Sequence, residues 1–255
     1  PGALRAPASL LDTGSGRFRV GPHRGEVGLA QLGPLPGGPL VGPEGVRRAT
    51  VRLQRDGWRR AVTPALSPIE QEAFFANGFT VREHLHLLER PVRLADARQG
   101  PVRPGLRLGR ATAADRPAIL TVDHVAFDEF WRLDERGLLD AIAATPSARL
   151  RVARQGDRIV GYHVTGRAGR RGYLQRLAVD PSLRRQGLAT ALIADGARWL
   201  ARCGVRTVVV NTQERNAGAL ALYEARDFVL QPGGLAVLER DLATTPAAPP
   251  AAARP

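Results

Sequence analysis

The chain has 255 residues, of which 44% are hydrophobic and 24% charged, and its formal net charge is +13 at pH 7. These values predict globular structure with a core and exclude a fibrous or wholly disordered chain. No apolar run approaches the roughly 18 residues of a membrane span, and the start has no segment of signal-peptide type. The single cysteine, Cys203, excludes an internal disulfide framework. We therefore expect a cytoplasmic protein without a membrane partner.

Every basic residue apart from histidine is arginine, because the sequence contains no lysine. A strong positive charge often accompanies nucleic-acid binding. The abundance of Ala, Gly, Pro and Arg also fits a compositional bias, however, and no basic segment is interleaved with aromatic residues that could stack on bases. We therefore do not expect a nucleic-acid partner. Without lysine, the chain has neither a Walker-type phosphate loop nor a pyridoxal Schiff base.

Two histidines, His84 and His86, are spaced to share one face of a strand. No cysteine or carboxylate cluster accompanies them, so we interpret them as side chains on an exposed strand face and predict no metal.

The first part of the chain is rich in Gly and Pro. Strand-like RFRV (17–20) and the alternation in ATVRLQRD (49–56) predict short strands joined by loops. The segment SPIEQEAFFAN (67–77) predicts a helix capped by Ser67 and ended by Gly78. A strand, FTVREHLHLLERPV, follows it.

The second part alternates strands and helices over a full domain length. Its predicted elements are a strand at 106–111, helices at 112–127 and 134–145, a hairpin at 148–167, a strand at 171–179, a helix to about 202, a strand at 206–212, a helix at 216–226 and two closing strands ending near 241. This order predicts an α/β (α+β) fold with a mixed sheet covered by helices.

A positively charged loop joins a strand to a helix in LAVDPSLRRQGLATALI (177–193). A helix N-terminus carries unpaired N–H groups and a partial positive charge, which together bind anions. Gly187 lets the backbone approach an anion closely, and Arg184 and Arg185 add charge. An ordinary exposed loop would explain the Pro and Gly but not the Arg-Arg-Gln run. The stretch therefore predicts a diphosphate site.

The block R-x-x-G-x-A in this loop is followed by NAGALALYEARDF (216–228). The two motifs, in this order, resemble the GNAT (GCN5-related) N-acetyltransferases over residues 106–241, and most nearly the ribosomal-protein alanine N-acetyltransferases. The resemblance implies a GNAT fold with a central, mixed, splayed sheet. It also implies direct transfer from acetyl-CoA, without a metal, to a primary amine of a protein or peptide N-terminus or of a small molecule. The alternative is a non-catalytic, acyl-CoA-binding regulatory protein.

The resemblance also assigns the residues that bind acetyl-CoA. The loop and first helical turn would bind the pyrophosphate, and the preceding strand would pair with the pantetheine arm as an added strand does. Asn216 would contact the cofactor from the next helix, although its position equally fits a plain N-cap. The assigned residues are Leu177, Ala178, Val179, Arg184, Arg185, Gln186, Gly187, Leu188, Ala189, Thr190 and Asn216.

The resemblance makes Tyr223 the general acid. A tyrosine with a pKa of about 10 is protonated at neutral pH and can supply a proton to the departing thiolate of coenzyme A. The alternative for Tyr223 is a core-facing aromatic residue. The acceptor amine is expected to approach near Phe130 and Trp131, beside the splayed strands.

The sequence departs from the family pattern in two places. Asp227 stands before Phe228 where a glycine is expected. Asn211 stands where the alanine N-acetyltransferases carry a glutamate general base, and asparagine cannot take a proton. Glu129 and Glu214 are the first alternative bases to consider.

The N-terminal part contains a short segment that is similar to one in the second part. EAFFANGF (72–79) aligns in register with ALYEARDF (221–228), and Phe74 occupies the place of Tyr223. Chance similarity of one helix and its flanks is the alternative. We predict a degenerate half-GNAT-like lobe at 1–90, a linker at 91–105, the catalytic domain at 106–241 and a disordered Ala/Pro tail at 242–255. Nothing in the sequence indicates the oligomeric state.

Overall fold

The computed structural model describes residues 9–97 and 105–243. Residues 98–104 of the predicted linker and 244–255 of the predicted tail lie outside the described residues. The strands are β1 (Ser9–Asp12), β2 (Arg17–Pro22), β3 (Leu29–Pro34), β4 (Arg60–Val62), β5 (Thr80–Pro91), β6 (Leu106–Arg110), β7 (Ser147–Gln155), β8 (Arg158–Ala168), β9 (Arg171–Val179), β10 (Thr207–Gln213), β11 (Val229–Leu230) and β12 (Leu235–Asp241). The α-helices are α1 (Pro43–Arg55), α2 (Pro68–Phe75), α3 (Arg116–Ala126), α4 (Glu135–Ala143), α5 (Leu188–Arg202) and α6 (Ala217–Glu224).

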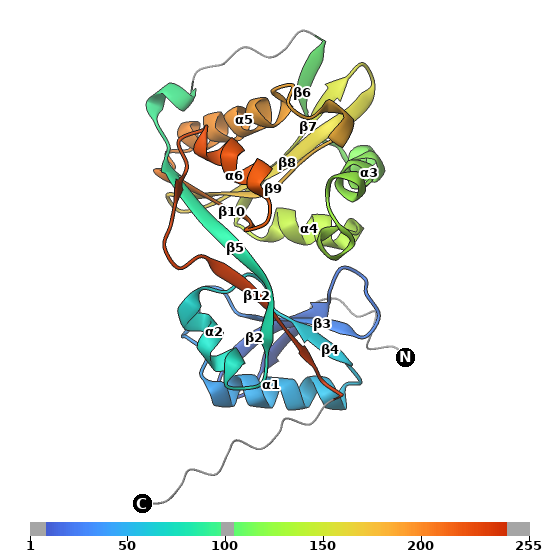
Figure 1. Ribbon diagram of the computed structural model, residues 1–255, viewed down its shortest axis with the longest axis vertical. Coiled ribbons are helices and arrows are strands. Elements are labelled where there is room, and N and C mark those ends of the chain that lie inside the picture. Colours follow the sequence, from blue (N-terminus) through green and yellow to red (C-terminus); the bar gives the residue numbers. More distant parts are fainter. Residues whose placement is uncertain (1–8, 98–104, 244–255) are drawn as a thin grey trace, which may run out of the picture. The chain divides into compact units, whose positions relative to one another are not determined.

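The chain forms two compact units (Figure 1). Unit 1 comprises Pro1–His86 and Gly233–Pro255, and unit 2 comprises Leu87–Pro232. The strand order is β1-β2-β3-β4-β12-β5 in unit 1 and β5-β10-β9-β8-β7-β6 in unit 2, where β11 also pairs with β5. Strand β5 thus contributes its first part to one unit and its last part to the other.

Helix α1 corrects one prediction. The alternation at 49–56 predicted a strand, which is wrong, because α1 runs through this stretch. Its buried residues Val46, Ala49 and Leu53 are three and four positions apart, so they form one face of a helix. This face packs in the core of unit 1, and Pro43 occupies the first helical turn, where its missing N–H costs nothing.

Helix α2 forms as predicted because its signals are local. Ser67 accepts and donates in a capping box with Glu70, whose carboxylate accepts the Ser67 N–H at 2.9 Å. The left-handed conformation of Gly78, with φ of 74°, then turns the chain out of the helix.

The unit boundaries differ from the predicted domains at both ends of unit 2. Strand β12 pairs with β4 and with the first part of β5, so the last described strand belongs to unit 1. At the other end, the Val92 N–H donates to the Arg206 carbonyl at 2.7 Å, and a 3₁₀ turn (Leu94–Ala97) follows. The first residues of the predicted linker are therefore part of the ordered structure of unit 2.

Unit 2 is a mixed sheet with helices on both faces, as predicted (Figure 1). Helix α5 packs on β7, β8 and β9, and helices α3 and α4 pack on the same strands. Helix α5 on one side and helices α3 and α4 on the other bury separate apolar clusters. Leu192, Ile193 and Leu200 of α5 belong to clusters distinct from the one formed by Ile119 of α3 and Leu138 of α4. The crossover β9–α5–β10 therefore places the predicted anion loop at one end of a covered sheet.

Candidate active site

Strands β9 and β10 pair over a short distance and then separate. Their parallel register covers only 171–173 against 207–209, whereas β9 stays paired with β8 as far as Val179. From Leu174 onward, the edge of β9 that faces β10 therefore has no strand partner among the described residues. The predicted pantetheine-binding residues Leu177, Ala178 and Val179 lie in this open stretch. An extended ligand that carries amide groups can pair with such an edge.

The turn after β9 is fixed by one carboxylate. Asp180 accepts the Ser182 N–H at 2.9 Å and the Ser182 hydroxyl at 2.7 Å, and it pairs with Arg158. The hydrogen bonds from Ser182, with the charge of Arg158, lower the pKa of Asp180 below its usual value. The chain therefore enters the anion loop at a defined angle.

The loop before α5 is built from left-handed residues. Arg185 has φ of 61° and Gly187 φ of 82°. A non-glycine residue in this region is uncommon and is often found at functional sites. No atom lies within 4 Å of where a Gly187 Cβ would stand, so the space above the glycine is open. The backbone at this glycine is therefore accessible to an anion in front of the first turn of α5.

The first turn of α5 presents its backbone donors toward the loop. Ala191 is the first residue whose N–H bonds back, to the Gly187 carbonyl at 2.9 Å. The N–H groups of Leu188, Ala189 and Thr190 precede that bond and have no helical acceptor. With Gly187 in front of them, they fit an anion of pyrophosphate type. Leu188 itself is buried and anchors the turn.

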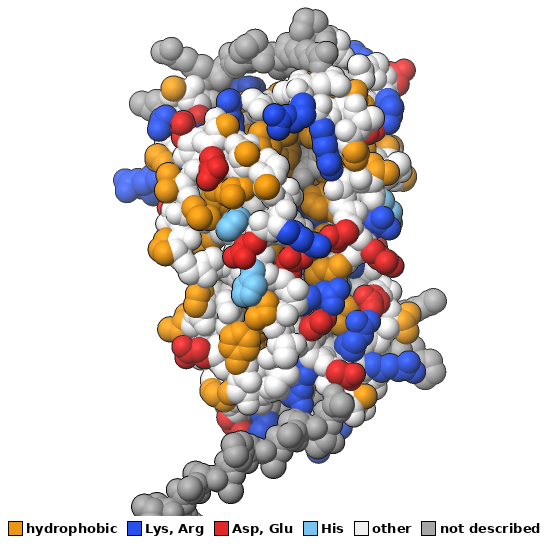
Figure 2. All heavy atoms as spheres, viewed as in Figure 1, with side chains coloured by type: hydrophobic (Ala, Val, Ile, Leu, Met, Phe, Trp, Pro, Cys, Tyr) orange, Lys and Arg blue, Asp and Glu red, His pale blue; other side chains and the backbone are white. Residues whose placement is uncertain are grey.

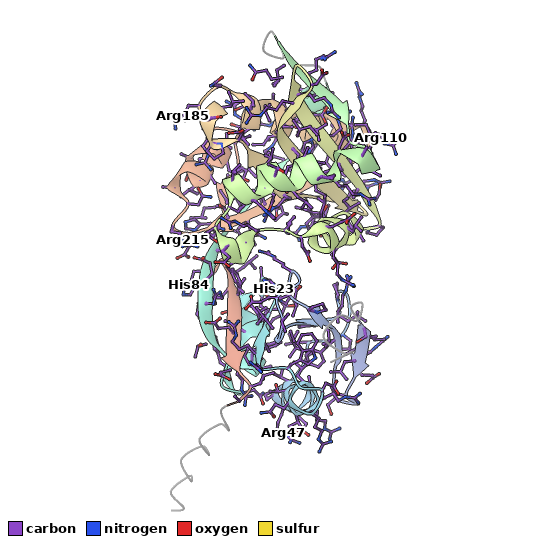
Figure 3. All side chains as sticks on the ribbon, turned by 90° about the vertical axis from the view of Figure 1, so that its right-hand side faces the viewer. His23, Arg47, His84, Arg110, Arg185 and Arg215 are labelled. Carbon is purple, nitrogen blue, oxygen red and sulfur yellow. The ribbon has the colours of Figure 1, made fainter. Side chains whose placement is uncertain are left out.

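Side chains around the loop supply its positive charge. Arg184 and Arg185 are exposed and Gln186 is half-buried. Arg184 donates to the Ala126 carbonyl at 3.4 Å, and Figure 3 shows Arg185 on the outside of the loop. On the face drawn in Figure 2, basic and acidic side chains are interspersed rather than gathered in one basic field.

Asn216 caps α6. Its Oδ1 accepts the Ala219 N–H at 3.1 Å, which confirms the N-cap reading. The side chain is exposed. Its amide NH₂ group is a donor that the cap does not involve, so Asn216 can cap the helix and donate to a ligand at the same time.

Tyr223 lies on α6 and is 6% exposed. Burial raises the pKa of its hydroxyl above the ordinary value, so the group is fully protonated at neutral pH. Its ring packs against Phe228, and the left-handed Asp227 (φ of 63°) makes the turn between them. Asp227 thus adopts the left-handed conformation for which a glycine is usual, and the protonated hydroxyl of Tyr223 is carried on a packed ring.

The possible bases differ in their positions. Asn211 is exposed on β10, two residues beyond the last pair with β9. Glu214 is exposed in the loop before α6, and Glu129 begins a 3₁₀ turn (Glu129–Trp131). None of the three side chains is buried.

The predicted acceptor residues Phe130 and Trp131 occupy that 3₁₀ turn. Both are half-buried, and their rings meet edge to face with centroids 5.1 Å apart. Arg215, labelled in Figure 3 on the loop before α6, pairs with Asp128 at 2.7 Å. The turn and the N-terminal loop of α6 are therefore in contact.

Sequence reasoning missed a buried carboxylate next to this turn. Asp123 of α3 is completely buried and accepts from Tyr162, Arg176 and the Leu133 backbone. Its partners Tyr162 and Arg176 lie 39 and 53 positions away in the chain, so no local pattern reveals the cluster.

Two further properties concern the described residues as a whole. None of the helices is long and apolar enough to cross a membrane. Across 9–97 and 105–243, no group of three or more His, Cys, Asp or Glu side chains is placed to hold a metal ion.

Comparison with protein families shows what this part of unit 2 is similar to. Residues 117–228 match the acetyltransferase (GNAT) family, and this stretch of unit 2 is therefore similar to that family. This range contains the anion loop, Asn216 and Tyr223.

Several curated relatives are more specific. The chain is 35% identical over 153 residues to the mycothiol acetyltransferase of Clavibacter michiganensis subsp. michiganensis, covering 56% of this chain and 50% of that protein. It is 28% identical over 179 residues to the mycothiol acetyltransferase of Amycolatopsis mediterranei, covering 63% of this chain and 58% of that protein. The chain thus spans about half the length of the curated relatives it matches.

Solved structures show the fold of the whole chain. A tandem GNAT protein from the clavulanic acid biosynthesis pathway superposes with a TM-score of 0.64 at 14% identity, covering 96% of this chain and 86% of that chain. A GCN5-related N-acetyltransferase from Kribbella flavida gives a TM-score of 0.63 at 14% identity, covering 94% and 91%. The fold is therefore a mixed-sheet GNAT fold, as predicted.

The predicted likeness to ribosomal-protein alanine N-acetyltransferases is wrong, because the four curated relatives are all named mycothiol acetyltransferase. The motif that suggested it, NAGALALYEARDF, consists of a capped helix and its exit. Such a segment reports the fold of this region and not the acceptor.

Proposed function

We propose that this protein transfers an acetyl group from acetyl-CoA directly to the primary amine of a small molecule. The observation that carries the proposal is the separation of β9 from β10 directly before the loop of Arg185 and Gly187. An open strand edge, an anion cradle and a protonated tyrosine then follow one another within unit 2. Together they match the three parts of an acyl-CoA: pantetheine arm, pyrophosphate and thioester.

The chain's own groups have distinct roles in this reaction. The N–H groups of 188–190, with Arg184 and Arg185, bind the pyrophosphate. Backbone groups of Leu177 to Val179 pair with the pantetheine arm, and a backbone N–H there stabilises the negative charge on the carbonyl oxygen as the amine attacks. A C–N bond forms, the thioester C–S bond breaks, and Tyr223 donates its proton to the departing sulfur.

Deprotonation of the amine is left to solvent or to a bound water, because Asn211 cannot act as a base. An α-amine with a pKa of about 8 is partly neutral at pH 7, whereas a lysine side chain with a pKa of about 10.4 is almost wholly charged. The acceptor is therefore a weakly basic amine. The name of the curated relatives supports a small-molecule acceptor, and we extend it to this chain as a proposal.

Unit 1 fits a degenerate half of a GNAT domain that binds no acetyl-CoA. The Phe79 N–H donates to the Phe74 carbonyl at 3.2 Å, as the Phe228 N–H does to that of Tyr223 at 3.1 Å. Phe74 lacks the hydroxyl of Tyr223, and Glu44 places an acidic side chain in the first turn of α1. That carboxylate is paired with Arg47 and Arg48, so it engages the basic side chains closest to this helix start.

A second candidate, favoured by the asparagine at position 211, is a non-catalytic protein that binds acyl-CoA and regulates a partner. Turnover separates the two. The purified chain is incubated with acetyl-CoA and a panel of small primary amines, peptides and lysine derivatives, and released thiol is measured. We expect turnover with weakly basic small amines. Tight acetyl-CoA binding by calorimetry without turnover on any amine would favour the regulatory alternative.

A further inference from the structure

We propose that Arg176 is a positioning residue that holds residues 127–133 against strand β9 and thereby sets the acceptor side of the active site. The inference rests on the proposed function for its kinetic consequence, whereas its structural part concerns unit 2 alone.

The guanidinium of Arg176 contacts three other residues of unit 2. Its Nε donates to Oδ2 of Asp123 at 2.8 Å, and its Nη2 lies 2.6 Å from the same oxygen. Nη2 also donates to the Trp131 carbonyl at 2.6 Å. The guanidinium carbon lies 3.5 Å from the centre of the Phe127 ring, within cation–π distance. The side chain therefore contacts this segment on both sides of Phe130.

Both oxygens of the Asp123 carboxylate, which binds Arg176, accept hydrogen bonds from other groups as well. Oδ1 of Asp123 accepts the Leu133 N–H at 2.7 Å, and Oδ2 also accepts the Tyr162 hydroxyl at 2.5 Å. The Asp123 and Arg176 side chains are 0% and 9% exposed. A buried charge that loses its partner is strongly destabilising, so this arrangement has few alternatives.

Arg176 is placed where β9 deviates from regular pairing. Opposite β8, Arg176 faces Val164 and Leu174 faces Thr165, so Gln175 between them is an inserted residue. Such a bulge redirects the side chains that follow it. The next residue is Leu177, the first of the proposed pantetheine contacts. The bulge thus directs Arg176 toward the acceptor turn, and its neighbour Leu177 lies at the proposed thioester site.

Two other arginines contact this segment or the residue directly before it, from different elements. Arg184 of the anion loop donates to the Ala126 carbonyl at 3.4 Å, and Arg215 pairs with Asp128 at 2.7 Å. The Arg215 and Asp128 side chains are 61% and 50% exposed, and exposed pairs contribute little. Of these three arginines, Arg176 therefore makes the buried contact with the turn.

The test uses two variants and a matched control. Arg176→Lys keeps the charge but loses the planar fork that serves Asp123 and Trp131 together. The double variant Arg176→Met with Asp123→Asn removes both charges and leaves an oxygen for Leu133, which guards against unfolding. The control, Arg151→Met, removes an arginine from another buried carboxylate, Asp195, which Arg151 contacts at 3.2 Å. Circular dichroism checks that each variant folds.

Two readouts are measured on the full chain. Hydrogen exchange of the 127–133 amides needs no substrate, and we expect faster exchange in the double variant, a smaller change in Arg176→Lys and none in the control. With alaninamide as the amine, we expect its KM to rise about tenfold or more in the double variant while the Kd for acetyl-CoA is unchanged.

The outcomes separate the two proposals. Unchanged exchange at 127–133 in the folded double variant would overturn the positioning role whatever the turnover. Equal rises of the amine KM in the double variant and the control would also overturn it, because the effect would then be general destabilisation. Absence of turnover in the wild-type chain would count against the proposed function, and the exchange data would still decide the role of Arg176.

Discussion

Tyr223 packs against Phe228 with ring centroids 5.6 Å apart and ring planes inclined at 60°. Unit 1 repeats this relationship with Phe74 and Phe79, whose centroids are 5.1 Å apart at 88°. In both units a left-handed residue, Asp227 or Gly78, precedes the second ring. The shared element is a helix exit that fixes an aromatic ring, and the tyrosine hydroxyl is what unit 2 adds to it.

The first prediction concerns that hydroxyl. Tyr223→Phe keeps the ring and its packing, so we expect unchanged acetyl-CoA affinity and a transfer rate lowered by about 10²- to 10⁴-fold. Single-turnover kinetics under conditions where chemistry is rate-limiting measure the rate. The matched control is Phe74→Tyr, which should leave the rate as it is. An unaltered rate in Tyr223→Phe would mean that the residue is structural.

The second prediction concerns the anion loop. Gly187→Glu places a side chain and a negative charge in the open space before α5, so we expect acetyl-CoA binding to be lost while the fold survives. Gly169→Glu is the matched control. Gly169 also has positive φ (+55°) and open space around it, but it lies in the turn between β8 and β9. Calorimetry should show one site per chain in the wild type and the control. Two sites, or wild-type affinity in Gly187→Glu, would contradict a single site in unit 2.

Local signals explain which elements could be predicted from the sequence. Caps at Ser67 and Asn216 and the glycine stop at Gly78 act within a few residues, and each lies where the sequence indicated. The pairing of β12 with β4 instead joins residues far apart in the chain, which no local pattern encodes.

The candidate site divides in the same way. Its loop and tyrosine belong to contiguous motifs, so a resemblance could find them. The contact between Arg176 and Asp123 joins residues 53 positions apart, and an Asp within a helical pattern normally predicts an exposed face. Likewise the alternation of apolar and polar residues at 49–56 looks like a strand although the segment is helical. The exposed Arg52 lies next to the buried Leu53 in the sequence, which imitates the two-residue period of a strand.

The third prediction concerns acid sensitivity. His163 is fully buried, with Nδ1 2.7 Å from Thr165 Oγ1 and Nε2 3.4 Å from Asp195. Burial lowers the pKa of His163 below its usual 6.5, even though Asp195 opposes that change. The unfolded chain then binds a proton that the folded chain does not, so stability is full above pH of about 6.5 and falls as the pH is lowered.

Asp195 adds a second pH range, at lower pH, in which the stability of the fold decreases. Burial opposes its ionisation, but the hydrogen bond from His163 and the charges of Arg151 and Arg149 together lower its pKa from 3.8 to about 2. Its contribution of about 2 kcal/mol is therefore present above pH of about 4 and lost as the pH falls toward 2. Urea unfolding at a series of pH values measures both windows. His163→Asn should flatten the dependence below pH of about 6.5. Because it also removes the His163 hydrogen bond that lowers the pKa of Asp195, it should weaken the lower window as well. An unchanged slope in that variant would assign the acid sensitivity to other groups.

The last prediction concerns the missing base. If deprotonation is left to solvent or to a water held by Asn211, kcat/KM should rise with pH through the pKa of the amine itself, because only the neutral amine attacks. Replacing the acceptor by one of lower pKa should shift the profile down by the same amount. Asn211→Glu places a carboxylate on β10 beyond the last pair with β9, so it should retain or increase activity, whereas Asn211→Gln offers no base and serves as the control. A wild-type profile that follows an enzyme group with a pKa of about 6 to 7, or a clear preference for lysine side chains, would show that another residue takes the proton. Glu129 and Glu214, both exposed, would then be the first to replace by glutamine.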